Sequence, residues 1–346
     1  MKQFITLQKL SPGDTVGVIS PSAGLPGLFP WVQDLGFTRL RDIFELIPKE
    51  YPTTRQMGSL LQDRADDIMA AFSDPGNKAV FASIGGDDQI KLIKLLDPKI
   101  FVNNPKPFFG FSDNTHLHNF LWNLGIPSYY GGNIMTEFGF QDEMPTMTIT
   151  SLKNALFNSG EYKLEESELF NDIGLPWSDK LNLSKQRVFE PNEGLQWDGL
   201  KSAKGVLWGG CVESLIVQCS TNTYLPDRED INGTILFIET AEDIPEAWVV
   251  EYLLTGFGER GWFDVLQGVL VGRPKAWEFD KPNTPEQKAV YKKQQRETII
   301  KTIREYNTKI PIVQNLDFGH TAPQIIMPYG GLVKIDSIEQ IITLMY

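Results

Sequence analysis

The stretch "KAVFASIGGDDQIKLIKLLD", residues 78–97, joins a strand pattern to a helix pattern across a pair of glycines. Its first part is a short apolar strand, and its second part places Ile90, Ile93 and Leu96 on one helical face. The same succession follows at once in "KPFFGFSDNTHLHNF", residues 106–120. Strands that alternate with helices in this way predict a parallel sheet covered by helices, and hence an α/β fold.

The alternation extends along the chain in both directions. A strand is predicted at 14–22 and a helix at 64–74, whereas residues 158–200 are polar, rich in Pro, Gly and Asn, and poorly periodic. Beyond them, strands are predicted at 203–210, 233–240, 263–274, 309–319, 331–337 and 340–346, and helices at 245–258 and 285–307. We therefore expect an N-terminal domain over 1–160, a linker and substrate-proximal loop over 161–200, and a C-terminal domain over 201–346.

The composition limits the classes of protein that this chain can be. Its 346 residues are 41% hydrophobic and 11% aromatic, which is enough for sizeable cores, and its formal charge of −12 argues against binding to nucleic-acid phosphates. No apolar run suits a signal peptide or a membrane span. The two cysteines, Cys211 and Cys219, lack metal-ligand spacing. We expect a cytoplasmic protein with reduced thiols and no membrane or nucleic-acid partner.

Ser112 stands where the strand pattern of residues 106–111 gives way to a helix pattern. One interpretation is a helix N-cap, whose hydroxyl accepts a hydrogen bond from a backbone amide further along. The other is a nucleophile at a sharp strand-to-helix turn, which exposes Oγ and directs the first helical amides at a developing oxyanion. The sequence "GFSDN" lacks the second glycine of the G-x-S-x-G motif, so both interpretations stay open.

A serine nucleophile needs a base, and the chain has only three histidines. His116 would lie one turn below Ser112 on the predicted helix, and His118 is rotated off that face. His320, on the loop "DFGHTAPQ" after a predicted strand, is therefore the better candidate, although an ordinary loop histidine remains the alternative.

The base also needs a carboxylate that orients its ring and stabilises the imidazolium. Glu239 ends the apolar strand "TILFIE" and is the best-placed candidate, with Glu242 and Asp243 as nearby competitors. A solvated acid in a loop is the alternative for each of them.

Gly85 and Gly86 follow a predicted strand, where the absence of a side chain lets the backbone approach a ligand. The amides of Gly86 and Asp113 are a candidate oxyanion hole, and Gly85 is a candidate substrate contact. A plain tight turn is the alternative. The chain contains neither G-x-G-x-x-G nor G-x-x-x-x-G-K-[ST] nor H-E-x-x-H, so neither phosphate-loop binding nor a catalytic metal is predicted.

Seven short motifs follow one another along the chain: "GDTVGVISPSAG", "SIGGDD", "GFSDNT", "GVLWGGCVESL", "LFIETAED", "GVLVGRP" and "FGHTAPQIIMPYGG". Taken together and in this order, they resemble the LD-carboxypeptidase family of serine peptidases, which includes murein tetrapeptide carboxypeptidases and microcin C self-immunity peptidases. The resemblance covers nearly the whole chain.

The resemblance implies a catalytic triad of Ser112, Glu239 and His320, with oxyanion amides at Gly86 and Asp113. It implies an N-terminal Rossmann-like domain, a C-terminal α/β domain with a small β-barrel core, a homodimer, and no metal or cofactor. The expected activity is serine-type carboxypeptidase or amidase chemistry through an acyl-enzyme. A non-catalytic small-ligand binding protein on the same fold is the alternative from another class.

The chain length, the wording "ETAED" and the long middle segment with "PWSD" are more similar to the microcin C self-immunity branch. That branch implies a peptidyl or aminoacyl nucleotide as substrate, and the murein branch implies a peptide ending in a D-residue. The tryptophan that the immunity branch carries just beyond "PWSD" is absent from "KLNLSKQ". Trp177 and Trp197 are candidates to replace it in a substrate pocket, and packing of the loop is the alternative for both.

Two arginines, Arg64 and Arg273, are candidate clamps for a carboxylate or phosphate, with surface ion pairs as the alternative. The stretch between Glu239 and His320 is longer than the family pattern implies. The segment "EFDKPNTPEQKAVYKKQQ" is expected to accommodate the extra length as a surface insertion.

Overall fold

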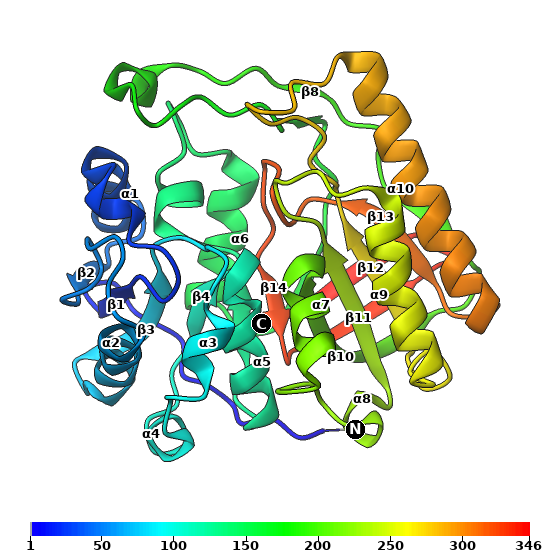
Figure 1. Ribbon diagram of the computed structural model, residues 1–346, viewed down its shortest axis with the longest axis horizontal. Coiled ribbons are helices and arrows are strands. Elements are labelled where there is room, and N and C mark those ends of the chain that lie inside the picture. The colour runs from blue at the N-terminus through cyan, green and yellow to red at the C-terminus, as the bar shows by residue number, and fades with distance from the viewer. Residues whose placement is uncertain (1) are drawn as a thin grey trace.

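The computed structural model describes residues 2–346, and Figure 1 shows two β-sheets with helices packed around them. The first sheet has six strands in the order β14-β5-β4-β3-β1-β2. Strands β1 to β5 pair in parallel, and β14 is antiparallel to β5. These strands are β1 (Thr15–Ile19), β2 (Ile47–Glu50), β3 (Asn77–Ala82), β4 (Phe108–Gly110), β5 (Ser128–Tyr130) and β14 (Met327–Tyr329).

Helices alternate with the strands of this sheet, which confirms the expected α/β organisation of the first half. The helix predicted at 88–97 is shorter than expected, because the chain tightens into i→i+3 hydrogen bonds at Leu95 and Leu96 before Pro98 starts a new helix. The helices are α1 (Pro30–Asp42), α2 (Leu61–Ser73), α3 (Ile90–Ile93), α4 (Pro98–Asn103), α5 (Thr115–Asn123) and α6 (Thr146–Phe157).

The second sheet has eight strands in the order β6-β16-β15-β10-β11-β12-β13-β9. Strands β10 to β13 pair in parallel, and β11 and β12 are buried along their whole length, which explains their apolar sequences. The small β-barrel expected from the family resemblance is not confirmed, because β6 and β9 form the two edges of an open sheet. The strands are β6 (Glu161–Lys163), β9 (Gln196–Asp198), β10 (Ala203–Cys211), β11 (Thr234–Glu239), β12 (Gly268–Gly272), β13 (Ile312–Leu316), β15 (Leu332–Asp336) and β16 (Ile341–Met345).

The helices of the second half are α7 (Val212–Thr221), α8 (Arg228–Ile231), α9 (Ala247–Glu259) and α10 (Pro285–Tyr306). Helix α10 begins where the sequence predicts, because Thr284 and Gln287 form a reciprocal capping box and Pro285 occupies the first helical position. It lies at the right-hand edge of the molecule in Figure 1 and packs against α9. The segment predicted as a surface insertion, residues 278–295, thus includes the first half of this long helix.

Residues 161–200 run across the top of the view in Figure 1, in green. A two-stranded ribbon forms within them from β7 (Leu169–Phe170) and β8 (Glu190–Pro191). Lys288 of α10 pairs with Asp172 at 2.6 Å, and both side chains are almost completely buried. The polar middle segment is therefore held against the second half of the chain by an internal ion pair rather than left as a free linker.

The two halves of the chain are interleaved by β14. This strand belongs to the C-terminal part of the sequence, yet it pairs with β5 of the first sheet, and the chain then returns to the second sheet as β15. A second contact lies at the end of β10, where a Cβ on Gly210 would meet the Thr115 side chain at 2.6 Å. The glycine thus allows β10 to approach the start of α5 closely.

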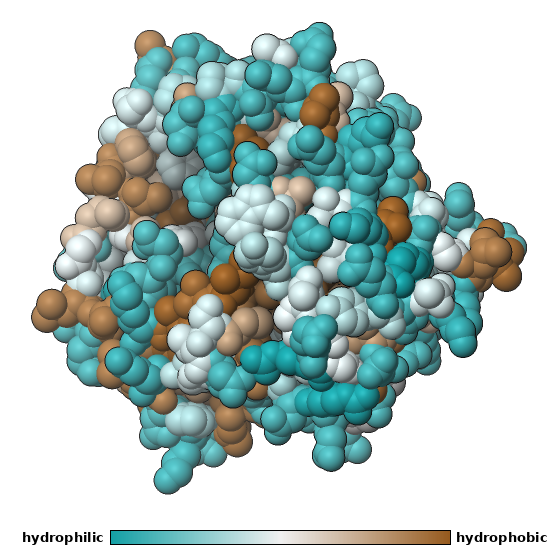
Figure 2. All heavy atoms as spheres, turned by 45° about the vertical axis from the view of Figure 1, so that its right-hand side comes forward, coloured by the Kyte–Doolittle hydropathy of each residue, from teal (hydrophilic) through white to brown (hydrophobic). Residues whose placement is uncertain are grey.

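No helix within residues 2–346 combines the length and the apolar character that crossing a membrane would require. Figure 2 shows the face that includes the right-hand side of Figure 1, where hydrophilic side chains dominate and hydrophobic ones appear in several separate places. Cys211 and Cys219 are both free thiols, the first buried and the second partly buried.

Candidate active site

Ser112 lies at the turn between β4 and α5. Its backbone φ is +65°, a value that a non-glycine residue adopts only when its surroundings impose it. Ser112 begins a short 3₁₀ turn, Ser112–Asn114, and neither this turn nor α5 has a side-chain cap hydrogen bond at its start. The interpretation of Ser112 as a helix cap is therefore wrong, and the sharp strand-to-helix turn is typical of a nucleophile elbow.

A continuous chain of hydrogen bonds connects this turn to His320. The Ser112 amide donates to the Tyr130 hydroxyl at 3.1 Å, and that hydroxyl donates to Glu239 Oε1 at 2.6 Å. Glu239 Oε2 accepts from His320 Nδ1, also at 2.6 Å. Glu239 is only 1% exposed, so these bonds form in a medium of low polarity, where electrostatic interactions are strong. The ends of β4, β5 and β11 thus meet at one place, as expected for ligand sites in α/β folds.

His320 is held between two carboxylates. Its Nδ1 contacts Glu239, and its Nε2 lies 3.0 Å from Glu242 Oε2. Burial acts against the charged imidazolium, but the two carboxylates outweigh it and hold the pKa of His320 well above its ordinary value. Burial likewise acts to raise the pKa of Glu242, but the charge of His320 prevails and lowers it to about 2.

Glu242 occupies the nitrogen of His320 that a serine nucleophile would use. The hydrogen bonds described for residues 2–346 include none between Ser112 Oγ and His320. The Glu242 side chain is 53% exposed, so water can compete for its carboxylate.

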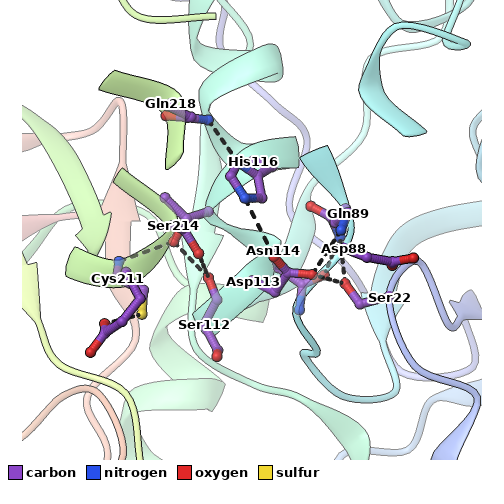
Figure 3. Close-up of polar contacts among 12 residues, drawn as sticks. Ser22, Asp88, Gln89, Ser112, Asp113, Asn114, His116, Cys211, Ser214 and Gln218 are labelled. Carbon is purple, nitrogen blue, oxygen red and sulfur yellow. Dashed lines mark hydrogen bonds and ion pairs between the residues drawn. The ribbon is translucent and has the colours of Figure 1, made fainter. Parts of the chain in front are cut away.

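The other two histidines lie inside the protein, away from the cavity. His116 contacts Asp113 Oδ1 at 3.4 Å through Nε2, and its Nδ1 lies 3.1 Å from the Gln218 amide (Figure 3). His118 bonds to the Gly110 carbonyl at 2.8 Å, and burial lowers its pKa to about 3, so it is neutral. Both are structural residues of α5, as expected when His320 was preferred as the base.

The Asp113 carboxylate ties two loops to the serine turn. Its Oδ2 accepts hydrogen bonds from the Ser22 hydroxyl at 2.7 Å and from the Gln89 amide at 3.0 Å (Figure 3). Burial raises the pKa of Asp113, but the hydrogen bond and charge of His116 outweigh it, so the net pKa is lowered. The carboxylate thereby fixes the loops after β1 and β3 beside the elbow.

The glycine pair after β3 lies directly against the serine. A Cβ on Gly85 would come within 3.1 Å of Ser112 Oγ and 3.5 Å of the Asp113 amide nitrogen. A Cβ on Gly86 would lie 2.6 Å from the Cβ of Ser22. Side chains are excluded at both positions, so the backbone beside Ser112 stays accessible to a small ligand.

A cavity of about 590 Å³ opens above these residues. That volume suits one small ligand of drug or nucleotide size. The residues discussed so far that line it are Gly85, Gly86, Ser112, Glu242 and His320. Glu239 lies behind His320 and not in the wall, as expected of a residue that acts on the base rather than on a substrate.

Of the candidate substrate-binding residues, the structure places Gly85 and Trp177 in the cavity wall. Trp177 packs edge-to-face on Phe29, with ring centroids 5.9 Å apart. Trp197 lies elsewhere: it belongs to edge strand β9 and packs against the core of the second sheet. Trp197 is therefore not part of the cavity wall.

The two candidate arginine clamps are internal ion pairs rather than cavity residues. Arg273 is 1% exposed, contacts Asp317 at 2.6 Å and does not line the cavity. Arg64 makes a bidentate contact with Asp88 at 2.8 and 2.9 Å. Both guanidinium groups are engaged in holding the fold.

Several polar residues of the site were missed by sequence reasoning. Tyr130, which links Ser112 to Glu239, had a usable signal, because it ends a strand like the other candidates. Arg187, Asn133 and Glu137 line the cavity as well. Arg187 stands in an irregular segment, and Asn133 and Glu137 stand at the start of and within the short π-helix Ile134–Phe138, so no local pattern marks them. No group of three or more His, Cys, Asp or Glu side chains in the described chain is arranged to hold a metal ion.

The chain is similar to known proteins over nearly its whole length. Two protein-family models match, described as the LD-carboxypeptidase N-terminal domain over residues 16–131 and the LD-carboxypeptidase C-terminal domain over residues 204–335. The chain is 24% identical over 334 residues to the microcin C7 self-immunity protein MccF of Escherichia coli, covering 94% of this chain and 92% of that one.

Two further relatives extend the comparison. The chain is 25% identical over 337 residues to the "Probable murein peptide carboxypeptidase" of Bacillus subtilis, covering 96% of this chain and 91% of that protein. Its structure is similar to the crystal structure of an MccF-like protein from Streptococcus pneumoniae in complex with AMP. The TM-score is 0.84 at 28% identity, over 96% of this chain and 99% of the other.

Proposed function

Because the chain belongs to the LD-carboxypeptidase family and is a serine-type carboxypeptidase, we propose that Ser112, Glu239 and His320 are its catalytic triad. The observation that carries the proposal is the chain of hydrogen bonds from Ser112 through Tyr130 and Glu239 to His320. It connects nucleophile, acid and base across the two halves of the chain and leaves Ser112 and His320 in one cavity wall.

The proposed reaction begins when His320 Nε2 takes the proton of Ser112 Oγ as Oγ attacks the terminal amide carbonyl. The carbonyl oxygen becomes an oxyanion, which accepts hydrogen bonds from the Gly86 and Asp113 amides. His320 then gives its proton to the leaving nitrogen, the C–N bond breaks, and an acyl-ester forms on Ser112. Water, deprotonated by His320, attacks this ester and releases the acid.

Glu239 supports each proton transfer from behind the histidine. Its carboxylate accepts from Nδ1, which leaves Nε2 as the nitrogen that would take the Ser112 proton, and its charge stabilises the imidazolium formed during attack. Tyr130 in turn donates to Glu239, and burial followed by the charge of Glu239 raises the pKa of Tyr130 well above its ordinary value. Tyr130 therefore stays protonated and keeps Glu239 in place.

The proposed substrate is a peptidyl or aminoacyl nucleotide. Aromatic side chains in the cavity wall, including Phe29, Trp177 and Phe279, offer flat surfaces on which a base can stack. The Streptococcus pneumoniae relative is described in complex with AMP, and the Escherichia coli relative is a microcin C7 self-immunity protein. Trp177 would supply the stacking surface that "KLNLSKQ" lacks. A murein peptide is the second candidate, favoured by the Bacillus subtilis relative.

Mass spectrometry of the purified protein separates the two candidates. The protein is incubated with aspartyl sulfamoyl-adenosine and, separately, with a murein tetrapeptide, with the Ser112→Ala protein as control. We expect hydrolysis of the nucleotide by the unaltered protein alone. Hydrolysis of the murein peptide alone would show that the second candidate function is the correct one. Hydrolysis of neither compound would refute both candidate substrates.

Replacing Glu242 by glutamine is expected to move the acidic limb of the kcat/KM profile to lower pH. The Glu242 carboxylate stabilises protonated His320, so removing its charge lowers the pKa of His320. Only the neutral imidazole acts as a base, so a lower pKa leaves more active enzyme at acidic pH. The measurement is kcat/KM from about pH 5 to about pH 9.

The control for this prediction is Asp243→Asn, which removes the same charge one residue further on, at an exposed position. Its acidic limb should coincide with that of the unaltered protein. If Glu242→Gln also left the limb in place, the contact between Glu242 and His320 would have no part in setting the base.

A further inference from the structure

Two basic side chains line the cavity, and only one of them has an acidic partner among the described residues. Lys275 pairs with Glu278, which lines the cavity beside it. Arg187 has no carboxylate within 4.0 Å among residues 2–346. No ion pair within the described chain therefore balances its charge at close range, which is an unfavourable state for an enclosed cation unless a ligand supplies the anion.

The guanidinium of Arg187 is nevertheless held firmly in place. It lies over the Phe140 ring at 4.0 Å from the centroid, and its Nε donates to Gln141 Oε1 at 2.5 Å. A weaker bond of 3.4 Å runs from Nη1 to Asn171 Oδ1. These contacts fix the plane of the group and leave N–H donors on the Nη2 side unused, which is the arrangement needed to bind two oxygens of one anion.

The charges around Arg187 favour an incoming anion. Burial lowers the pKa of Arg187 to about 10, so it stays positive at neutral pH. Burial raises the pKa of Glu137, the acid with most influence on it, to about 7. Glu137 is thus only partly ionised near neutral pH and compensates Arg187 incompletely.

Asn133 shows independently that this part of the cavity is built for a ligand. Its side chain is completely buried and lines the same cavity, yet neither its Oδ1 nor its Nδ2 has a hydrogen-bond partner in the described chain. A buried amide without partners is costly and uncommon. A substrate that presents a donor and an acceptor, such as an amide group, would satisfy both atoms.

We infer that Arg187 is the anion-binding residue of this cavity and holds two oxygens of a phosphate or carboxylate on the substrate, with Asn133 binding an amide group of the same molecule. The inference rests on the proposed function only in taking the ligand of this cavity to be the substrate. A nucleotide would supply the phosphate and a peptide the carboxylate, and both present the same pair of oxygens to a guanidinium.

The test measures binding by calorimetry to the Ser112→Ala protein, so it needs no turnover. The probes are two matched pairs: AMP with adenosine, and an N-acetylated dipeptide acid with its C-terminal amide. We expect Arg187→Gln to weaken binding of one charged probe by about 100-fold while its neutral partner binds as before. Loss confined to AMP identifies a phosphate, and loss confined to the dipeptide acid identifies a carboxylate.

The control is Arg228→Gln, which removes an arginine at a surface position with 53% side-chain exposure. Arg187→Lys keeps the positive charge but lacks the planar guanidinium with its paired N–H donors, so it should recover only part of the lost affinity. Equal affinity of Arg187→Gln and the parent for both charged probes, or equal losses for charged and neutral probes, would overturn the inference. Hydrolysis is measured separately on the unaltered protein. A failed binding test therefore does not contradict the catalytic proposal, and a failed hydrolysis test does not contradict the role of Arg187.

Discussion

The Ser112→Ala protein is expected to lose turnover by about 10⁵-fold while keeping its fold, because loss of a serine nucleophile removes covalent catalysis altogether. The residual rate would come from substrate binding and the oxyanion amides of Gly86 and Asp113. Stability should change little: the backbone φ of +65° at this position disfavours alanine and serine alike, and the hydroxyl makes no capping hydrogen bond. The measurements are kcat on the substrate identified by mass spectrometry and the thermal unfolding midpoint.

A matched control is Ser214→Ala. Ser214 is buried on α7, and its hydroxyl lies 3.5 Å from the Ser112 carbonyl oxygen, so the same atom is removed from the same neighbourhood. Its kcat should stay within about threefold of the unaltered value, since this long hydrogen bond is weak. A Ser112→Ala protein that retained a tenth of the original kcat would exclude Ser112 as the nucleophile.

Glu239→Gln is expected to lower kcat by about 10³-fold, with a much smaller change in KM. Glutamine has nearly the same shape, and its amide oxygen can still accept from His320 Nδ1 while its amide nitrogen faces the Tyr130 hydroxyl. The positions of His320 and Tyr130 are therefore kept, whereas the negative charge beside His320 is lost. The imidazolium that forms during attack on the substrate is then no longer stabilised, so the loss falls on the chemical step.

Two further variants separate charge from packing at this position. Glu213→Gln changes a partly buried acid, which accepts from the Cys211 thiol and the Ala241 amide, and its effect on kcat should be below about tenfold. Tyr130→Phe removes the donor to Glu239 and should give an intermediate loss. If Glu239→Gln and Glu213→Gln were equally active, the carboxylate beside His320 would have no special part in catalysis.

Sequence patterns predicted the core of the fold because each central strand is an apolar run bounded by turn residues. They also located Ser112 and Glu239, since both end such strands, and His320 by elimination among three histidines. The open second sheet was not predictable in this way. Its edge strands β6 and β9 are only three residues long and come from the polar middle segment, where pairing with a distant strand decides the conformation.

The candidate substrate-binding side chains show more clearly what local sequence patterns cannot predict. Trp197 and Trp177 stand in the same polar segment, and only the tertiary fold sends one into a strand and the other to the cavity. Arg273 and Arg187 differ in the same way: the first meets Asp317 inside the protein, and the second forms no ion pair with any acid of residues 2–346. Whether a charged residue is paired depends on contacts between segments that are distant in sequence, which no local pattern records.

The path of β14 has a consequence for how such proteins can evolve. The loop that carries His320 leaves the second sheet after β13 and ends in the first sheet at β14, so both halves determine where the histidine lies. Recombination that joined the front of one family member to the back of another would insert a foreign strand beside β5. We therefore expect the two family domains to be inherited as one unit, with divergence in specificity concentrated in segments around the cavity, such as the stretch between the short edge strands β6 and β9.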